Sequence, residues 1–254
     1  MADLAPILKT MSRLTQISGP LITRYFRRPM EFEEKQDQSP VTVADREAEA
    51  AIRKVLEEEY PDCGILGEEY GHSRPDAERQ WILDPIDGTK SFISGTPLFG
   101  TLIGYLEAGV PLAGAMHLPV LGELLLGTDE SCTLNGIPVR VRSCEHLSRA
   151  TLLTTSVRSI EQHKDPIAFH SLVQRVKLFR GWGDCFGYYL LATGYADIMV
   201  DPIVNAWDIQ PLIPIVRGAG GKITDYEGGD PVQADSAVAT AGAIHQEVIE
   251  MLRG

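Results

Sequence analysis

The sequence predicts a mixed α and β fold in which an antiparallel sheet is followed by alternating strands and helices. Short apolar runs at 101–106, 111–116 and 121–126 are separated by turn signals, and Asn135-Gly136 is typical of a hairpin. From about residue 150 the pattern changes to strand–helix alternation, which favours an α/β second half. The 254 residues show no internal repeat or flexible linker. We therefore expect one unit, 1–254, with halves at 1–145 and 146–254.

Two helices are predicted at the start of the chain. Apolar side chains recur at helical spacing over residues 4–21, with polar residues between them, which indicates an amphipathic helix packed on a core. The polar segment 35–45 contains a Ser-Pro turn signal and is predicted to be a loop. Either Thr42 or Asp45 could cap the helix that follows.

The remaining elements are predicted from the same kinds of pattern. A short apolar strand from Ile65 should run into paired acids, and the apolar start of the stretch at Trp81 predicts a buried strand. In the second half we predict strands at 151–155, 176–179, 197–200, 222–225 and 237–241, and helices at 166–176, 185–193, 209–216 and 244–252.

Composition narrows the choice of partners and of compartment. The net charge of −12 argues against a nucleic-acid partner. It does not exclude a small anionic substrate, because a bound metal can reverse the local field. The four cysteines are scattered and form no CxxC pair, so we expect free thiols in a reducing cytoplasm. The sequence contains no apolar run of membrane-spanning length and no visible targeting segment, so we expect no membrane partner.

The stretch from Trp81 to Thr89 carries the strongest chemical signal. Two carboxylates, Asp84 and Asp87, follow the predicted strand three residues apart. Pro85 fixes its own φ and pushes Asp84 towards an extended conformation, and Gly88 frees the backbone before a helix or turn. Two acids at a strand end, followed by exposed N–H groups at a helix start, suit a hard cation with a phosphate beside it.

Further acidic positions have ordinary explanations when each is taken singly. Glu68-Glu69 could be a surface pair, although adjacent acids stay charged most easily in water or beside a cation. Asp45 and Asp208 could be ordinary helix caps. Together with 84–89, and with the Gly-Ala-Gly-Gly segment 218–221, these positions form a specific combination.

This combination, with Lys35 and Thr42-x-x-Asp45 upstream, resembles the inositol monophosphatase superfamily of metal-dependent phosphatases. The resemblance runs from about residue 30 to about residue 225, with the blocks in the same order. It implies a layered α-β-α-β-α sandwich of the inositol monophosphatase/fructose-1,6-bisphosphatase type, a small phosphate-ester substrate and a homodimer. It also implies roughly two to three Mg²⁺ ions per site, with Mn²⁺ as an alternative.

The resemblance implies a role for each matching residue. The first ion would be held by Glu68, Asp84 and the Ile86 carbonyl, the second by Asp84, Asp87 and Asp208, and a weaker third with help from Glu69 through water. The substrate phosphate would lie on the N–H groups of Gly88 and Thr89, with Asp208 also beside the substrate. Thr89 and Asp45 would orient and deprotonate the attacking water. Such chemistry needs positioning and charge neutralisation, not a protein nucleophile.

Within the superfamily the sequence is most similar to the histidinol-phosphate phosphatase branch. The cues are the segment 87–102 and Arg180-Gly-Trp182-Gly183-Asp184-Cys185. Histidinol phosphate carries an ammonium and an imidazole, so a carboxylate at Asp184 would favour it by about 1.5–3 kcal/mol. Asn205 is a further candidate for substrate contact.

Three alternatives stay open at this point. Asp184 could merely cap the helix that starts at Cys185. The chain could be a phosphatase of the same superfamily that acts on inositol 1-phosphate or sugar phosphates. It could also be a protein that binds metal or phosphate without catalysis.

Overall fold

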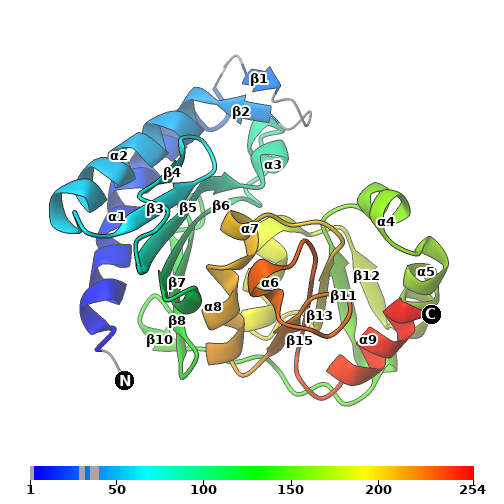
Figure 1. The fold of residues 1–254 in the computed structure, drawn as a ribbon. Coiled ribbons are helices and arrows are strands. Elements are labelled where there is room, and N and C mark those ends of the chain that lie inside the picture. The colour runs from blue at the N-terminus through cyan, green and yellow to red at the C-terminus, as the bar shows by residue number, and fades with distance from the viewer. Residues whose placement is uncertain (1–2, 29–31, 35–39) are drawn as a thin grey trace.

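The computed structural model describes residues 3–28, 32–34 and 40–254. Two β-sheets alternate with three layers of helices, and Figure 1 shows these layers side by side, from α1 and α2 on one flank to α5 and α9 on the other. This is the predicted α-β-α-β-α sandwich. Lys35, which belongs to the predicted loop, lies outside the described residues.

The first helical layer consists of α1 (Ala5–Tyr25) and α2 (Val43–Glu59). Met11 and Leu14 of α1 and Leu56 of α2 are fully buried in one core with Trp81 of the large sheet. The first helix is therefore confirmed. The loop prediction was wrong at its end, because Thr42 closes strand β2 (Pro40–Thr42) and is also the N-cap of α2.

The large sheet has the strand order β10-β9-β8-β7-β6-β5-β3-β4. Its strands are β3 (Gly64–Gly67), β4 (Gly71–Ser73), β5 (Arg79–Asp87), β6 (Gly100–Glu107), β7 (Val110–Leu118), β8 (Glu123–Thr128), β9 (Cys132–Leu134) and β10 (Ile137–Pro138). Every pairing is antiparallel except that of β3 with β5. The predicted antiparallel region and its hairpin at Asn135-Gly136 are confirmed.

The middle layer contains α6 (Asp184–Ala192), α7 (Ala206–Ile209) and α8 (Leu212–Gly218). The prediction of one helix over 209–216 was wrong, because the chain forms two helices that meet at Pro211. The turn between them packs tightly on β7. A Cβ at Gly114 would lie 1.9 Å from the Pro211 carbonyl oxygen, so only glycine allows this approach. That contact holds α7, and with it Asp208, against the large sheet.

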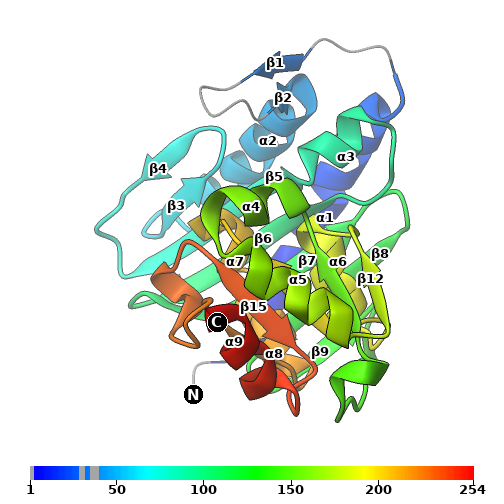
Figure 2. The same cartoon turned by 90° about the vertical axis from the view of Figure 1, so that its right-hand side faces the viewer.

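The small sheet has the order β12-β11-β13-β15-β14, with β11 parallel to both β12 and β13 and the other pairs antiparallel. Its strands are β11 (Thr151–Thr154), β12 (Leu178–Arg180), β13 (Ile198–Asp201), β14 (Lys222–Thr224) and β15 (Ala237–Thr240). The outer helices are α4 (Val157–His163), α5 (Pro166–Arg175) and α9 (His245–Arg253), which face the viewer in Figure 2. Helix α4 was not predicted.

The remaining elements are short. They are β1 (Phe32–Glu34), which pairs with β2, the helix α3 (Thr89–Ile93), and two 3₁₀ turns at Leu147–Arg149 and Pro231–Gln233. The four cysteines, all within the described residues, are free and buried. None of the helices in the described part of the chain combines the length and apolarity needed to cross a bilayer.

Candidate active site

Asp84 and Asp87 reach one cavity because strand β5 is bulged between them. Asp84 pairs with Leu102 of β6 and Asp87 with Gly100, so three steps along β5 match two steps along β6. In a regular strand, side chains three residues apart point to opposite faces, and the extra residue of a bulge removes that alternation. Pro85, which cannot donate to the ladder, lies at the bulge. The predicted strand end is thus a bulge inside a longer strand.

Asp45 and Asp208 each use one oxygen to close the start of a helix. In α2, Oδ2 of Asp45 accepts hydrogen bonds from the N–H and the hydroxyl of Thr42. In α7, Oδ2 of Asp208 accepts from the N–H of Asn205 at 2.7 Å and from its side-chain amide at 3.2 Å. They form one half of a capping box, and in the other half the side chain of the N-cap residue accepts the backbone N–H of the acid. Capping and a role in the site are therefore compatible, because the cap engages only Oδ2 of each carboxylate.

Asp84, Asp87 and Asp208 form a compact acidic cluster. One oxygen from each lies within 4.8 Å of the others. Burial raises the pKa of Asp84 well above its usual range, and the charges of Glu68, Asp87 and Asp208 raise it further. Burial, with the charges of Asp184 and Asp208, also raises the pKa of Asp87, and burial raises that of Asp208 to about 7. Asp84 is buried and the other two are partly buried, and three acids this close repel one another when charged unless a cation joins them.

The donor atoms of this region fit a hard divalent cation. Oδ1 of Asp84 and Oδ1 of Asp45 are buried and have no hydrogen-bond partner among the described residues. Buried polar atoms without a partner are rare, and they point to an ion or a water molecule. The candidate ligands are all oxygens, which favours Mg²⁺ or Mn²⁺ over a zinc site built from sulfur and nitrogen.

Glu68 and Glu69 lie in the turn between β3 and β4. The N–H of Glu68 donates to the Leu83 carbonyl of β5 at 3.1 Å, which holds this turn beside the bulged strand. Glu68 lines the same cavity as the acidic cluster. The pKa of Asp45 is raised to about 7, mainly by burial and also by the charges of Glu69 and Glu68, while its hydrogen bonds from Thr42 oppose the rise.

Gly88 and Thr89 contribute backbone groups to the lining of the cavity. Gly88 is the N-cap of α3 with a φ of 88°, and a Cβ there would lie 2.9 Å from the Leu98 carbonyl oxygen and 3.2 Å from Oδ2 of Asp184. Only glycine satisfies both the backbone angle and the close approach. The Thr89 hydroxyl donates to the Ile86 carbonyl at 2.9 Å. The first N–H groups of a helix have no partner within it, so they are available to an anion.

One cavity of about 210 Å³ brings together most of the predicted site residues. Those that line it are Glu68, Asp84, Ile86, Asp87, Gly88, Thr89, Asp184, Asn205 and Asp208. Asp45 and Glu69 are not among the lining residues, although the charges of Glu69 and Glu68 both act on Asp45. Lys90 and Trp207 also line the cavity, although the sequence analysis assigned them no role.

Asp184 enters this cavity from the first turn of α6. The N–H of Cys185 donates to Oδ2 of Asp87, which joins the start of α6 to the acidic cluster. The N-cap of α6 is Gly183, and no side-chain cap is formed there by the described residues. The alternative that Asp184 caps this helix was therefore wrong. The pKa of Asp184 is raised to about 7, first by burial and then by the charge of Asp201, while the charge of Lys90 opposes the rise.

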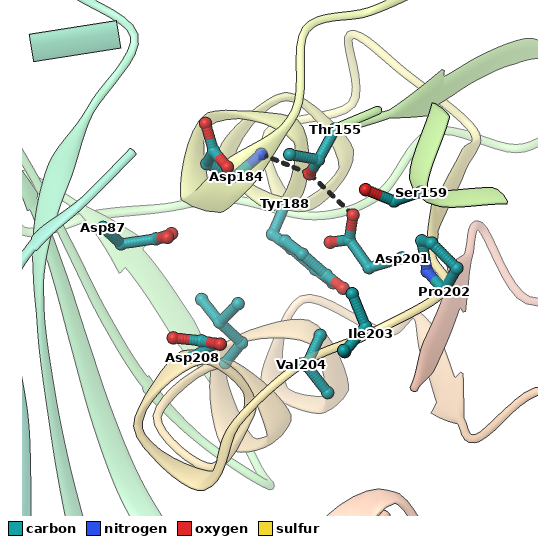
Figure 3. Close-up of a pocket in the computed structure, with 11 residues that line it drawn as sticks. Asp87, Thr155, Ser159, Asp184, Tyr188, Asp201, Pro202, Ile203, Val204 and Asp208 are labelled. Atoms are coloured by element: carbon teal, nitrogen blue, oxygen red, sulfur yellow. Dashed lines mark hydrogen bonds between the residues drawn. The ribbon is translucent and has the colours of Figure 1, made fainter. Parts of the chain in front are cut away.

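A smaller cavity of about 80 Å³ continues from the acidic cluster (Figure 3). It shares Asp87, Asp184 and Asp208 with the larger one and adds Thr155, Ser159, Tyr188, Asp201, Pro202, Ile203, Val204 and Leu212. Asp201 is 5% exposed, and burial raises its pKa to about 6. Asp201 was not predicted to be a site residue. The available signal was an acid directly after a predicted strand, at the carboxyl end where α/β folds gather ligands.

Comparison with known proteins agrees with this architecture. The profile of the inositol monophosphatase family matches residues 3–254. A histidinol-phosphatase from Chlorobaculum parvum is 38% identical over 252 residues, 97% of this chain and 96% of that protein. The chloroplastic bifunctional phosphatase IMPL2 of Arabidopsis thaliana is 39% identical over 252 residues, 94% of this chain and 72% of that protein. A solved inositol monophosphatase from Zymomonas mobilis has a TM-score of 0.90 at 35% identity, with 100% of both chains covered.

The layered fold, the acidic cluster and the helix start beside it define a phosphatase. The matches span the chain, so the resemblance found in its motifs is confirmed, and the chain belongs to the inositol monophosphatase family.

Proposed function

We propose that this protein is a Mg²⁺-dependent phosphomonoesterase that hydrolyses L-histidinol phosphate to L-histidinol and phosphate. The observation that carries the choice of substrate is the pair of carboxylates, Asp184 and Asp201, beside the acidic cluster. Histidinol offers an ammonium and an imidazole to these groups, whereas inositol offers only hydroxyls. A charge-assisted hydrogen bond is roughly twice as strong as a neutral one.

The cation ligands are the oxygens that converge on the larger cavity. Glu68, Asp84 and the Ile86 carbonyl would hold one ion, and Asp84, Asp87 and Asp208 would hold a second, with Glu69 assisting a third through water. Mg²⁺ held there, or Mn²⁺ in its place, would neutralise phosphate charge and make a water molecule more acidic. Oδ1 of Asp84 is buried and has no hydrogen-bond partner in the part of the chain that the structure describes, which supports the assignment of Asp84 as the shared ligand.

The attacking water is positioned by Thr89 and Asp45. The Thr89 hydroxyl donates its hydrogen bond to the Ile86 carbonyl, so the hydroxyl oxygen can accept a hydrogen bond from water. Asp45 has one oxygen held by Thr42 and the other without a partner among the described residues. A carboxylate whose pKa lies near 7 is suited to take a proton at neutral pH.

The substrate lies between backbone and carboxylates. Its phosphate is bound by the N–H groups of Gly88 and Thr89, and Asp208 lies beside it in the same cavity. Its cationic part extends towards Asp184 and Asp201, with Asn205 at the rim as a further contact. This arrangement keeps the phosphate ester within reach of the attacking water. The positive charge of the leaving alcohol binds to the carboxylates of Asp184 and Asp201.

An inositol- or sugar-phosphate phosphatase is the second candidate. It is favoured by the likeness to the Zymomonas mobilis inositol monophosphatase. The acidic cluster and the N–H groups of Gly88 and Thr89 would bind the phosphate of either substrate. The two candidates therefore differ only in what the cavity around Asp184 and Asp201 binds. We also propose a homodimer and a cytoplasmic location, for which light scattering and cell fractionation are the direct tests.

The experiment that tests the proposed chemistry is phosphate release from L-histidinol phosphate with Mg²⁺ and with EDTA. We expect release with Mg²⁺, none with EDTA, and none from Asp84→Asn at any Mg²⁺ concentration. The exposed variant Asp62→Asn is the control for the loss of one charge. Release that survives EDTA would refute the metal mechanism. Mg²⁺ binding without release from any ester would identify a non-catalytic binding protein.

A further inference from the structure

Glu49 is a buried acid with no part in the reaction described above. It lies on α2, one helical turn after Asp45, and its side chain is 0% exposed. Its Oε2 accepts the N–H of Glu69 at 2.8 Å, and its Oε1 accepts the N–H of Tyr70 at 3.2 Å. The Glu49 carboxylate therefore binds the backbone of the turn that carries Glu68 and Glu69.

Arg53, one turn further along α2, also binds this turn. Its Nε donates to Oε1 of Glu49 at 2.7 Å, and its Nη2 donates to the carbonyl of Gly71. The two side chains thus hold both the N–H groups and a carbonyl of the same turn. The fit is close, because a Cβ at Gly67 would lie 2.0 Å from Oε1 of Glu49. A larger residue at Gly67 would displace the carboxylate from the turn.

Stability alone does not account for this ion pair. Removing two charges from water costs several kcal/mol per ion, and apolar residues of similar volume often serve as well or better. A carboxylate behind Glu68 and Glu69 also adds like charge to an acidic region, which Arg53 must offset. What the pair supplies is geometry: it fixes the Glu68–Tyr70 turn relative to the helix that carries Asp45.

We propose that Glu49, held by Arg53, is a positioning residue that sets the Glu68-Glu69 turn for cation binding. The inference rests on the proposed function in one respect, namely that Glu68 is a cation ligand. Glu49 itself touches neither cation nor substrate in this account. Groups that orient metal ligands typically change metal affinity by about 10–100-fold when they are removed.

The test is calorimetric titration of the metal-free protein with Mn²⁺, with no substrate present, for wild type, Glu49→Gln and Glu49→Asp. We expect both variants to bind Mn²⁺ about 10–100-fold more weakly than wild type. The aspartate keeps the charge but is one methylene too short to reach the turn. Weaker Mn²⁺ binding by Glu49→Asp would therefore show that the position of the carboxylate, and not only its charge, is required. Glu57→Gln, on the exposed face of α2, is the matched control and should bind as wild type does.

The Mg²⁺ dependence of turnover gives a second readout. In both Glu49 variants we expect the Mg²⁺ concentration for half-maximal activity to rise by the same factor, with kcat at saturating Mg²⁺ within about threefold of wild type. A lower kcat with unchanged Mn²⁺ affinity would overturn the proposal, as would wild-type Mn²⁺ affinity in Glu49→Asp. If Glu49→Gln does not fold, the double variant Glu49→Leu with Arg53→Met removes both charges, and wild-type Mn²⁺ affinity there would overturn the proposal equally. A wild-type protein that binds no Mn²⁺ would overturn the proposed function as well.

Discussion

Asp184 and Asp201 are joined by a single hydroxyl group, that of Thr155 (Figure 3). The Thr155 hydroxyl accepts the N–H of Asp184 at 2.8 Å and donates to Oδ1 of Asp201 at 2.6 Å. Asp184 has a φ of 50°, which is uncommon for a residue with a Cβ and needs support from its surroundings. Thr155 therefore links the backbone at the start of α6, which carries Asp184, to the Asp201 carboxylate.

Replacing Asp184 should change selectivity more than chemistry. In Asp184→Ala we expect KM for L-histidinol phosphate to rise by about 10–100-fold, the loss of one charge-assisted bond of roughly 1.5–3 kcal/mol. Hydrolysis of p-nitrophenyl phosphate, which has no cationic group, should change little. Steady-state kinetics on both esters measures this. Equal losses on the two esters would show that Asp184 has a structural role.

Replacing Thr155 tests the link between the backbone of Asp184 and the carboxylate of Asp201. Thr155→Val removes both hydrogen bonds while keeping the shape, and Thr155→Ser keeps the hydroxyl. We expect the valine variant to lose about tenfold of its preference for L-histidinol phosphate over p-nitrophenyl phosphate, or roughly 1.4 kcal/mol. The serine variant should retain most of that preference. A serine variant as poor as the valine variant would show that the methyl group, not the hydroxyl, is what matters.

Thr89 should be needed for turnover and not for cation binding. In Thr89→Ala we expect kcat to fall by about 10²–10⁴-fold, the usual range for a group that assists proton transfer. Mn²⁺ affinity, measured by calorimetry without substrate, should stay close to that of wild type. Thr89→Ser is the conservative control and should recover much of the rate. Full turnover in the alanine variant would refute the role assigned to Thr89 in orienting water.

The acidic site should make the stability of the metal-free protein depend on pH. The pKa values of Asp45, Asp184 and Asp208 are raised to about 7, and that of Asp201 to about 6. The folded state therefore binds protons more tightly than the unfolded chain over this range. The resulting stabilisation is full below the unfolded value of 3.8 and is lost as pH rises through about 7.

The increase in Tm on saturation with Mg²⁺ is the measurement that isolates this effect. Cations replace the protons, so we expect the Mg²⁺-induced increase to be larger at about pH 8 than at about pH 5.5. Comparing the protein with and without Mg²⁺ at each pH cancels the contribution of titrating groups elsewhere in the protein. One such group is buried His245, whose pKa is lowered by burial to about 4, so that its contribution to stability is lost as pH falls. An equal or smaller increase at the higher pH would contradict the electrostatic account of the site.

The sequence identified the chemistry of the site better than its geometry. The acids at 68, 84, 87 and 208 were recognisable because their residue types and spacing match a family pattern. That Asp84 and Asp87 share a cavity depends on a β-bulge, and a bulge is defined by the partner strand β6, which local pattern does not reveal. Thr42 and Asp45 were predicted as alternative caps, although the structure uses both in one capping box.

Other features could not be predicted from the sequence because they depend on packing between elements that are distant along the chain. The break at Pro211 accompanies the contact of its carbonyl with Gly114, nearly one hundred residues earlier in the chain. Asp201 became a site residue only when the small sheet placed β13 beside α6. Glu49 looked like one polar residue in an amphipathic helix until the turn at Glu69 was seen to bind it.

The most direct test of the central claim is the ratio of kcat/KM for L-histidinol phosphate to that for inositol 1-phosphate, both measured with saturating Mg²⁺. We predict a preference of about a hundredfold for L-histidinol phosphate, which corresponds to roughly 2.7 kcal/mol of differential transition-state binding. Comparable or better use of inositol 1-phosphate would leave the metal mechanism intact and would contradict the substrate assigned to Asp184 and Asp201.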